Sequence, residues 1–218
     1  MSRKLDALRQ RLQLKPLGAI SFTGLRFAAV VRGWVFANYL RVVWRCRVGR
    51  RMVCFGWPRV AMLFGRVEIG DDVCLGRYCH LQCGLHGTLL IGRKTFIGDF
   101  VTIGAEERIM IGEDVQIAEC AGIRDFDHIH SSPDIPIQEQ GFVTQPITIG
   151  RDVWIARCVT ILKGADIGAG SIIAANAVVR GHLEPNSIAA GVPAKKIKDR
   201  FGSQQPATVS TDGGQLLG

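Results

Sequence analysis

The chain has 218 residues, a length typical of one domain with an appended segment. Its composition, 47% hydrophobic and 21% charged, is that of a folded globular protein and excludes a disordered chain. The net charge of +8 is unevenly divided, because residues 1–60 hold thirteen Lys and Arg and one acid, a net of +12. Residues 61–218 therefore carry −4, so the basic character belongs to the N-terminal segment.

Residues 1–47 are predicted to form a helical segment that is both apolar and basic. The polar stretch Met1–Pro16 has the composition of a short basic helix, and residues 17–44 are rich in large apolar side chains and alanine. Three arginines interrupt this apolar stretch, so it lacks the roughly 18 uncharged residues of a membrane-spanning helix. Those arginines, and the lack of a small-residue cleavage site, also argue against a secretory signal.

Trp34, Tyr39 and Trp44 lie among these arginines. Aromatic and basic side chains together suit the headgroup region of an anionic membrane, which predicts peripheral contact with the inner face of the cell membrane. The alternative is that the helix packs on the following domain as a cap, which solenoid folds need for solubility. Nucleic acid is disfavoured as a partner, because the arginines alternate with large aliphatic residues and no nucleic-acid-binding motif is present.

A six-residue period organises the β-domain predicted for residues 48–200. This period is typical of a parallel β-helix, in which each hexad supplies one short strand and one corner. The aliphatic positions that repeat are Ile69, Leu75, Leu81, Ile91, Ile97, Ile103, Ile111, Ile117, Ile123, Ile149, Ile155, Ile161, Ile167, Ile173 and Val179. From Ile149 on, a second small or apolar residue, predicted to fill a corner, follows four positions later: Val153, Val159, Ala165, Ser171, Ala177 and Leu183. We therefore expect an all-β fold.

The breaks in the period are informative. The spacing is six within each group of three hexads and becomes ten, eight and then twenty-six between groups. Each insertion follows a third hexad, so all insertions are expected at one corner of a triangular prism, a face that often carries function in repeat proteins. The longest insertion, residues 127–145, is predicted to be a loop that hangs from this face and holds two of the five histidines.

Two further features bear on the class of protein. The seven cysteines form no C-x-x-C pair, which favours reduced wall residues of a cytoplasmic protein over a metal site, so no metal is expected. Residues 201–218 are rich in Gly, Ser, Gln and Thr and are predicted to be disordered.

Three strings, Asp127–His130, Pro146–Ile155 and Pro185–Lys195, resemble the hexapeptide-repeat acyltransferases. The likeness spans residues 67–200 and is strongest to the galactoside and maltose O-acetyltransferase group and its relatives in polysaccharide biosynthesis. It implies a left-handed β-helix, acetyl-CoA as the donor, and a homotrimer with active sites between neighbouring prisms. The first sixty residues instead resemble the apolar, basic leader of enzymes that modify lipid-linked glycans.

By this resemblance His128 is the catalytic base, and Asp125 or Asp127 orients its imidazole. Histidine side chains titrate near neutral pH, which suits removal of a proton from a sugar hydroxyl as it attacks a thioester. Carboxylates orient imidazoles in other enzymes. No Ser or Cys nucleophile is needed, so direct transfer is implied. His130, two residues on, is the rival base and is expected near the acceptor.

The resemblance also assigns the donor site. The family positions fall on Trp154, Arg157, Ala175 and Arg180 along the coenzyme, and on Lys195 and Lys198 at its phosphates. The family's Gly-Ala-Gly reads Ala-Ala-Asn at residues 174–176, so the fit along the arm is expected to differ. On the acceptor side, a family Asn falls on Gly98, whereas a family acidic position falls on Glu106. The acceptor is therefore expected to differ from the family's simple sugars.

These features predict an acetyl-CoA-dependent O-acetyltransferase that acts on a glycan or lipid-linked glycan precursor. Two alternatives remain open. One is N-acetyl transfer to an amino sugar or a xenobiotic acceptor. The other is a non-catalytic β-helix scaffold or a metal-binding relative, because one fold hosts several functions.

Overall fold

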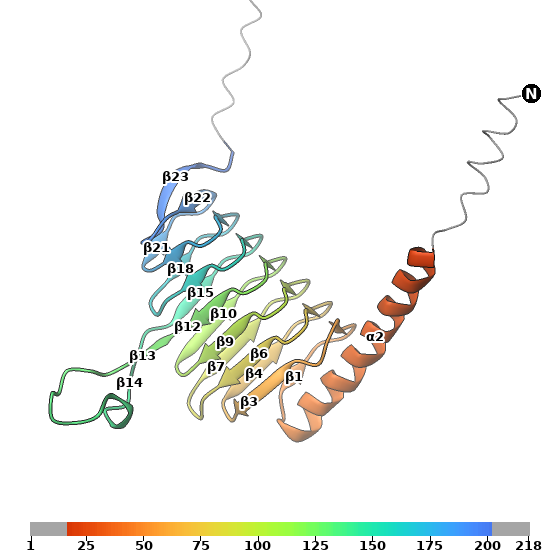
Figure 1. Ribbon diagram of the computed structural model, residues 1–218, viewed down its shortest axis with the longest axis horizontal. Coiled ribbons are helices and arrows are strands. Elements are labelled where there is room, and N and C mark those ends of the chain that lie inside the picture. The colour runs from red at the N-terminus through yellow and green to blue at the C-terminus, as the bar shows by residue number, and fades with distance from the viewer. Residues whose placement is uncertain (1–16, 202–218) are drawn as a thin grey trace, which may run out of the picture.

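The computed structural model describes residues 17–201, which form one long helix followed by a stack of β-coils (Figure 1). The basic helix expected in residues 1–16 and the disorder expected from residue 202 onward lie outside the described residues. Helix α2 runs over Leu17–Val43, and the prism begins with a strand at Arg47. The all-β parallel β-helix that the six-residue period predicts is confirmed.

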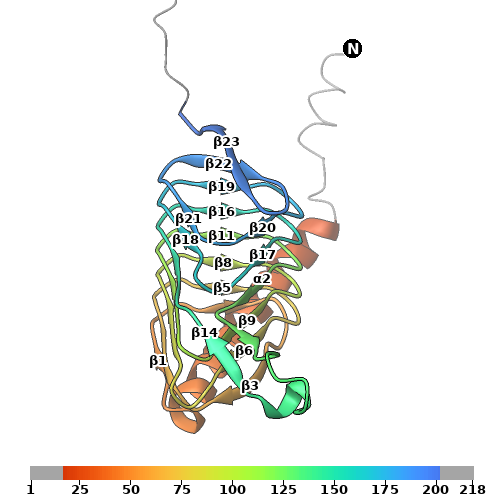
Figure 2. The same ribbon diagram turned by 90° about the vertical axis from the view of Figure 1, so that its left-hand side faces the viewer.

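Three sheets form the walls of the prism, as Figure 2 shows, and each of the first six coils gives one strand to each sheet. Sheet A contains β1 (Arg47–Val48), β4 (Arg66–Ile69), β7 (Thr88–Ile91), β10 (Arg108–Ile111), β15 (Ile147–Ile149), β18 (Asp166–Ile167) and β21 (His182–Leu183). Sheet B contains β2 (Val53–Cys54), β5 (Cys74–Leu75), β8 (Phe96–Ile97), β11 (Gln116–Ile117), β16 (Trp154–Ile155), β19 (Ile172–Ile173), β22 (Ser187–Ala190) and the antiparallel β23 (Lys195–Asp199). Sheet C contains β3 (Arg59–Leu63), β6 (His80–Cys83), β9 (Thr102–Ala105), β12 (Gly122–Arg124), β17 (Thr160–Ile161) and β20 (Val178–Val179).

The aliphatic positions of the hexads form columns inside the prism. In sheet A, Ile69, Ile91, Ile111, Ile149 and Ile167 pair in succession, and all five are buried. Neighbouring strands of a sheet lie about 4.8 Å apart, so each column is a continuous row of packed side chains. Each group of three hexads ends in sheet C, and the next group begins in sheet A. All insertions between groups therefore leave the prism at the corner that joins these two sheets.

The last complete coil is shorter than the period predicts. Leu183 follows Val179 by only four residues, yet it pairs with Ile167 in sheet A and is buried. The sequence placed Leu183 at a corner, and the structure corrects this to a core position. The turn between sheets C and A is two residues shorter here than in the preceding coil, and Gly181 within it has a φ of 75°, a conformation that glycine adopts without strain.

Helix α2 caps the first coil, as the alternative reading of the N-terminal segment expected. Phe36, Ala37 and Leu40 belong to the same buried cluster as Met52 of the first coil. The two backbones approach closely at Gly33, where a β-carbon would collide with the carbonyl group of Met52. The helix therefore extends the hydrophobic core beyond the first coil and covers its end.

Two arginines of α2 hold the helix on the first coil through hydrogen bonds to its backbone carbonyls. Arg32 Nη1 donates to the carbonyl of Cys54 at 2.7 Å, and Arg41 Nη2 donates to the carbonyls of Val48 at 2.9 Å and Gly49 at 2.6 Å. The first coil has no earlier coil to pair with, so its outer carbonyls need partners of another kind. Within residues 17–201, no helix combines the length and apolar character that crossing a membrane requires.

Candidate active site

The longest insertion leaves the corner between sheets C and A as a two-stranded ribbon rather than as a plain loop. Strand β13 (Phe126–His128) pairs antiparallel with β14 (Phe142–Thr144), and the 3-10 turn η1 (Ile137–Glu139) lies between them in sequence. At the base of the ribbon, the N–H of Gln145 donates to the carbonyl of Asp125 at 2.9 Å. Figure 1 shows the ribbon projecting from the side of the prism.

His128 lies on this ribbon at a cleft of about 330 Å³. Its ring packs against the ring of Phe142, with centroids 4.6 Å apart. The floor of the cleft is the outer face of sheet C, where Thr102, Gly122 and Thr160 stand in one column. A β-carbon on Gly122 would meet only the Thr102 hydroxyl, at 3.7 Å, so the floor is open there. The cleft thus places an imidazole beside hydroxyl groups and free space.

Asp125 holds the base of the ribbon. Its side chain is fully buried and accepts hydrogen bonds from the backbone N–H groups of Glu106 (2.8 Å), Glu107 (3.0 Å) and Arg108 (2.7 Å). Both carboxylate oxygens are therefore bound to the corner between β9 and β10. This arrangement corrects the role expected from the sequence, in which Asp125 would orient an imidazole.

Asp127 and His130 also have partners of their own. The Asp127 carboxylate forms an ion pair with Lys163 Nζ at 2.7 Å, which ties β13 to the turn that follows β17 in the next coil. His130 Nδ1 lies 3.1 Å from the carbonyl oxygen of His128, and the lining of the cleft includes His128 and not His130. Of the two loop histidines, His128 is the one placed at the cleft.

Two of the expected donor residues lie together, at the corner between sheets B and C. Arg157 forms an ion pair with Glu119 at 3.3 Å, and its carbonyl accepts a hydrogen bond of 3.1 Å from Asn176, the neighbour of Ala175. Arg180 follows β20 and lies at the other corner of sheet C. The structure therefore brings Arg157 and Ala175 together and separates both from Arg180.

The remaining expected residues are spread over the prism. Trp154 stands on the outer face of sheet B and is 51% exposed. Lys195 and Lys198 lie exposed on β23, at the C-terminal end of the stack. Glu106 is half-buried and accepts a hydrogen bond from Gln82 Nε2 at 3.2 Å, next to the corner that the ribbon base holds. None of these four lines the cleft at the ribbon.

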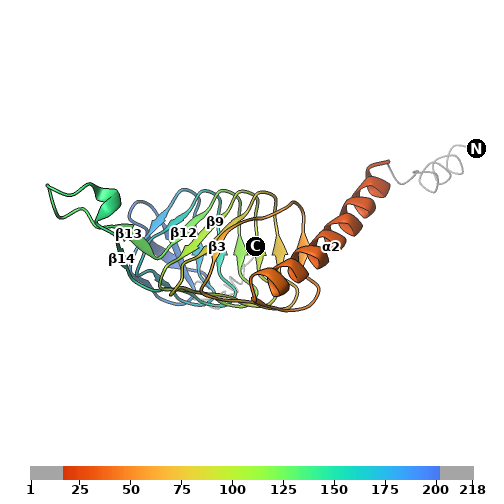
Figure 3. The same ribbon diagram turned by 90° about the horizontal axis from the view of Figure 1, so that it is seen from below.

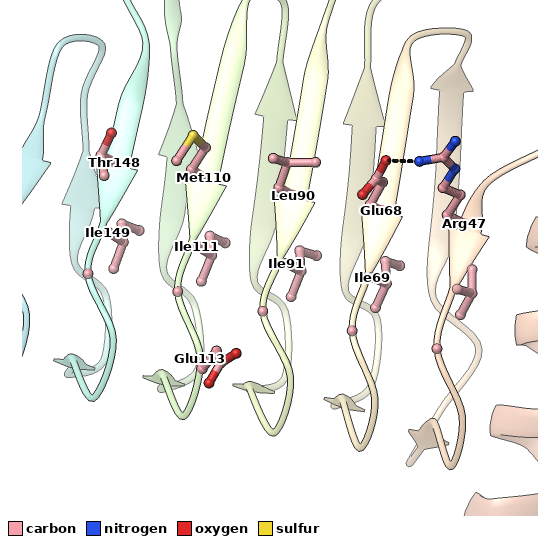
Figure 4. Close-up of a pocket in the computed structure, with 16 residues that line it drawn as sticks. Arg47, Glu68, Ile69, Leu90, Ile91, Met110, Ile111, Glu113, Thr148 and Ile149 are labelled. Atoms are coloured by element: carbon pink, nitrogen blue, oxygen red, sulfur yellow. Dashed lines mark hydrogen bonds and ion pairs between the residues drawn. The ribbon is translucent and has the colours of Figure 1, made fainter.

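A larger hollow of about 700 Å³ lies on the outer face of sheet A (Figure 4). Its floor is a column formed by Glu68, Leu90, Met110 and Thr148. The carboxylate of Glu68 is held by Arg47 Nη1 at 3.0 Å, and no histidine or cysteine lines this hollow. Size alone would favour this surface, but its two acids, Glu68 and Glu113, are both held in ion pairs with arginines. We therefore assign the chemistry to the smaller cleft, which a histidine lines.

Sequence reasoning missed the cleft floor and the contacts that hold the ribbon. Thr102, Gly122 and Thr160 each precede the aliphatic residue of a third hexad, so the alternation of a strand between inside and outside would have identified them. Phe142 and Lys163 carried no such signal. Their contacts depend on the path of the inserted ribbon, which has no period.

The chain shows clear similarity to known proteins. The model of the bacterial transferase hexapeptide family (six repeats) matches residues 146–181. The probable acetyltransferase Rv3034c of Mycobacterium tuberculosis is 35% identical over 173 residues, which are 78% of this chain and 52% of the relative. The putative lipopolysaccharide biosynthesis O-acetyl transferase WbbJ of Escherichia coli is 34% identical over 141 residues, 62% of this chain and 72% of WbbJ. This chain therefore spans only about half the length of the mycobacterial relative.

A solved structure shares the fold. A point mutant of AntD, an N-acyltransferase from Bacillus cereus in complex with dTDP and coenzyme A, aligns with a TM-score of 0.56 at 23% identity, over 75% of this chain and 89% of AntD. The likeness to WbbJ is stronger in sequence and covers most of that protein's length. With its stacked six-residue repeats, the chain belongs to the hexapeptide-repeat acetyltransferase family.

Proposed function

We propose that the chain transfers an acetyl group from acetyl-CoA to a sugar hydroxyl of a glycan or lipid-linked glycan precursor. The observation that carries this proposal is the position of His128 at a cleft whose floor holds hydroxyl groups and an open glycine. WbbJ, described as an O-acetyl transferase of lipopolysaccharide biosynthesis, supports a glycan oxygen as the acceptor.

In the proposed reaction, the His128 imidazole takes the proton of the acceptor hydroxyl as the oxygen attacks the thioester carbon. A carbon–oxygen bond forms, the carbon–sulfur bond breaks, and the imidazolium returns the proton to the leaving sulfur. Packing takes the place of an orienting carboxylate, because the ring of Phe142 lies against the imidazole. Both substrates are bound at once, and no acyl group is attached to the protein.

The charge and size of the expected donor residues suit acetyl-CoA. Lys195 and Lys198 are exposed cations suited to phosphates, and Ala175 is small and leaves its corner open to a pantetheine arm. In one chain, the width of sheet C separates the corner of Arg157 from His128. We therefore infer that acetyl-CoA binds between neighbouring prisms of a homotrimer, where one prism supplies the histidine and another the donor corner.

The test of the proposal is turnover of acetyl-CoA with a panel of glycan precursors, with the product identified by mass spectrometry. An O-acetyl ester is cleaved by mild alkali, whereas an N-acetyl amide survives, so treatment of the product separates the two reaction types. An alkali-labile acetyl group on a saccharide is expected. An alkali-stable product would replace the proposal by N-acetyl transfer, and absence of turnover across the panel would favour a scaffold.

The phosphate-binding role predicts a specific defect. The double variant Lys195→Ala, Lys198→Ala is expected to raise KM for acetyl-CoA about tenfold, since each lysine loses a charge-assisted contact at an exposed site. KM for acetyl-dephospho-CoA, which lacks one phosphate, should rise less. Lys196→Ala is the matched control on the same strand, because Lys196 is bound to Glu184 and Asp199. Equal effects on both donors would place the lysines away from the phosphates.

The ion pair between Lys163 and Asp127 predicts a positioning effect. Lys163→Met is expected to lower kcat about tenfold, because β13 loses its tie to the prism and a shift of 1 Å in a catalytic group can cost about 10²-fold. Stability should fall by no more than about 1 kcal/mol, as for other exposed pairs. Asp127→Asn should lower kcat as much as Lys163→Met does, and the double variant should show no further loss of kcat. Lys94→Ala, which removes a charge at another corner, is the control, and additive losses would contradict the role of the pair.

A further inference from the structure

The side of α2 that faces away from the prism is apolar. Six side chains spaced three or four residues apart form one stripe on it, and they are 40–78% exposed: Phe27, Val31, Trp34, Val35, Tyr39 and Val42. We call this stripe the outer face. The opposite side is buried on the first coil through Ala29, Phe36, Ala37 and Leu40. A helix that is apolar all round is normally covered all round, and the prism covers only one side.

Aromatic side chains of the first coil continue this surface. Trp57 is 60% exposed and shares a hollow with Val35 and Tyr39 of the outer face. On the other side, Phe64 is 61% exposed and contacts Trp44, with ring centroids 5.7 Å apart. The apolar surface therefore extends from α2 to two corners of the prism. Tryptophan and tyrosine are the residues enriched where a bilayer meets water.

The charged residues of α2 and the first coil are all basic. Residues 17–65 contain eight arginines and no acid. Carbonyls of the first coil or acids of the second coil bind five of them: Arg32, Arg41, Arg47, Arg50 and Arg51. Arg45 and Arg59 are exposed and form no ion pair within residues 17–201. An apolar surface bordered by cations is complementary to an apolar layer bordered by anions.

We propose that the outer face of α2, together with Trp57 and Phe64, docks on the surface of an anionic lipid bilayer. The apolar side chains enter the boundary between headgroups and acyl chains, and Arg45 and Arg59 meet lipid phosphates. In this upright orientation the first coil lies nearest to the bilayer, and the later coils lie progressively farther from it. Figures 1 and 3 both place α2 at one side of the molecule and the ribbon of β13 and β14 at the other, so this orientation leaves the cleft of His128 clear of the bilayer.

A bilayer fits this surface better than a second copy of the chain does. In a contact between two outer faces, Arg45 and Arg59 of each copy would find no acid in residues 17–65 of the other, and like charges across an interface are unfavourable. Gly33 lies against the backbone of Met52, so the first coil already occupies the side of the helix opposite the outer face. The docking concerns a surface separate from the cleft and does not depend on the proposed reaction.

Flotation of the full chain with vesicles provides the first test. Binding is expected to vesicles of phosphatidylglycerol and phosphatidylcholine, and not to phosphatidylcholine alone. It should weaken as salt rises from about 0.1 M to about 1 M, over which the Debye length falls from about 10 Å to about 3 Å. Val31→Asp with Val42→Asp should lower the affinity about tenfold or more, because charge replaces inserted apolar surface.

Ile197→Asp is the matched control, since Ile197 is 63% exposed at the far end of the prism, and it should bind as the unaltered chain does. Thermal melting of both variants shows whether each remains folded. The proposal is overturned if the unaltered chain ignores anionic vesicles, or if Ile197→Asp loses binding equally. It is also overturned if Val31→Asp with Val42→Asp lowers the molar mass of the protein measured in the absence of lipid, because the outer face would then be a contact between chains.

The four tryptophans test the orientation directly. Trp154 lies in the fifth strand of sheet B, so it is about 19 Å from the first coil at 4.8 Å per strand. In variants that keep only Trp34 or only Trp154, lipids brominated on their acyl chains should quench the fluorescence of Trp34 and leave that of Trp154 unchanged. Quenching of Trp154 equal to that of Trp34 would overturn the upright orientation.

Discussion

Replacing His128 with alanine is expected to lower kcat by about 10²–10⁴-fold, the usual contribution of a general base. This corresponds to about 3–5 kcal/mol of activation free energy. The expectation rests on the lining of the cleft, which offers one histidine and one acid. The acid, Asp127, is bound to Lys163, so His128 is the group left to accept the hydroxyl proton. Steady-state kinetics with acetyl-CoA and a saccharide acceptor measure the loss.

Two further variants separate proton transfer from packing. The His128 ring contacts Phe142, so alanine also removes a packing partner from the ribbon. His128→Gln keeps a planar polar side chain there but cannot accept the proton, and it should lose as much activity as His128→Ala. His130→Ala should leave kcat nearly unchanged. If His130→Ala is the more damaging variant, the base has been assigned to the wrong histidine, and an active His128→Gln would show that the ring acts by packing alone.

The fold was predictable because its core repeats along the chain. Ile111 and Ile149 pair in adjacent coils although the longest insertion separates them, and the period alone identified both as core positions. The period also located the insertion and hence the histidine on it. It failed at Leu183, where a shortened turn changes the spacing while the position stays buried. A repeat therefore predicts which residues face the core wherever turn length is constant.

The contacts between coils were not predictable in the same way. In the sequence, Arg32 and Arg41 only interrupt an apolar helix, whereas in the structure both donate hydrogen bonds to carbonyls of the first coil. These carbonyls need side-chain donors because no strand precedes the first coil, and nothing in the local sequence records this. Asp125 is a similar case. Its three N–H partners come from the corner between β9 and β10, seventeen to nineteen residues earlier in the chain, so its role became visible only in the structure.

Asp125→Ala is expected to lower the free energy of unfolding by about 3–5 kcal/mol, because three backbone N–H groups at the corner lose a charged acceptor. The lower end of this range applies where water replaces some of the lost bonds. For a chain of this size the melting temperature should fall by on the order of 10 °C. The stability of Asp125→Asn should lie between those of the unaltered chain and Asp125→Ala, since an amide keeps one acceptor oxygen but presents its NH2 group to an N–H donor.

Asp127→Asn is the matched control for this prediction. Asp127 lies two residues away and is exposed, so its loss should cost no more than about 1 kcal/mol. A change below about 1 kcal/mol for Asp125→Ala would show that the buried carboxylate does not hold the corner. Because the N–H of Gln145 also donates to the carbonyl of Asp125, both ends of the ribbon meet at this residue. Amide exchange in residues 126–144 should therefore accelerate in Asp125→Ala more than in the hexads of the last coils, where the stacked ladders remain intact.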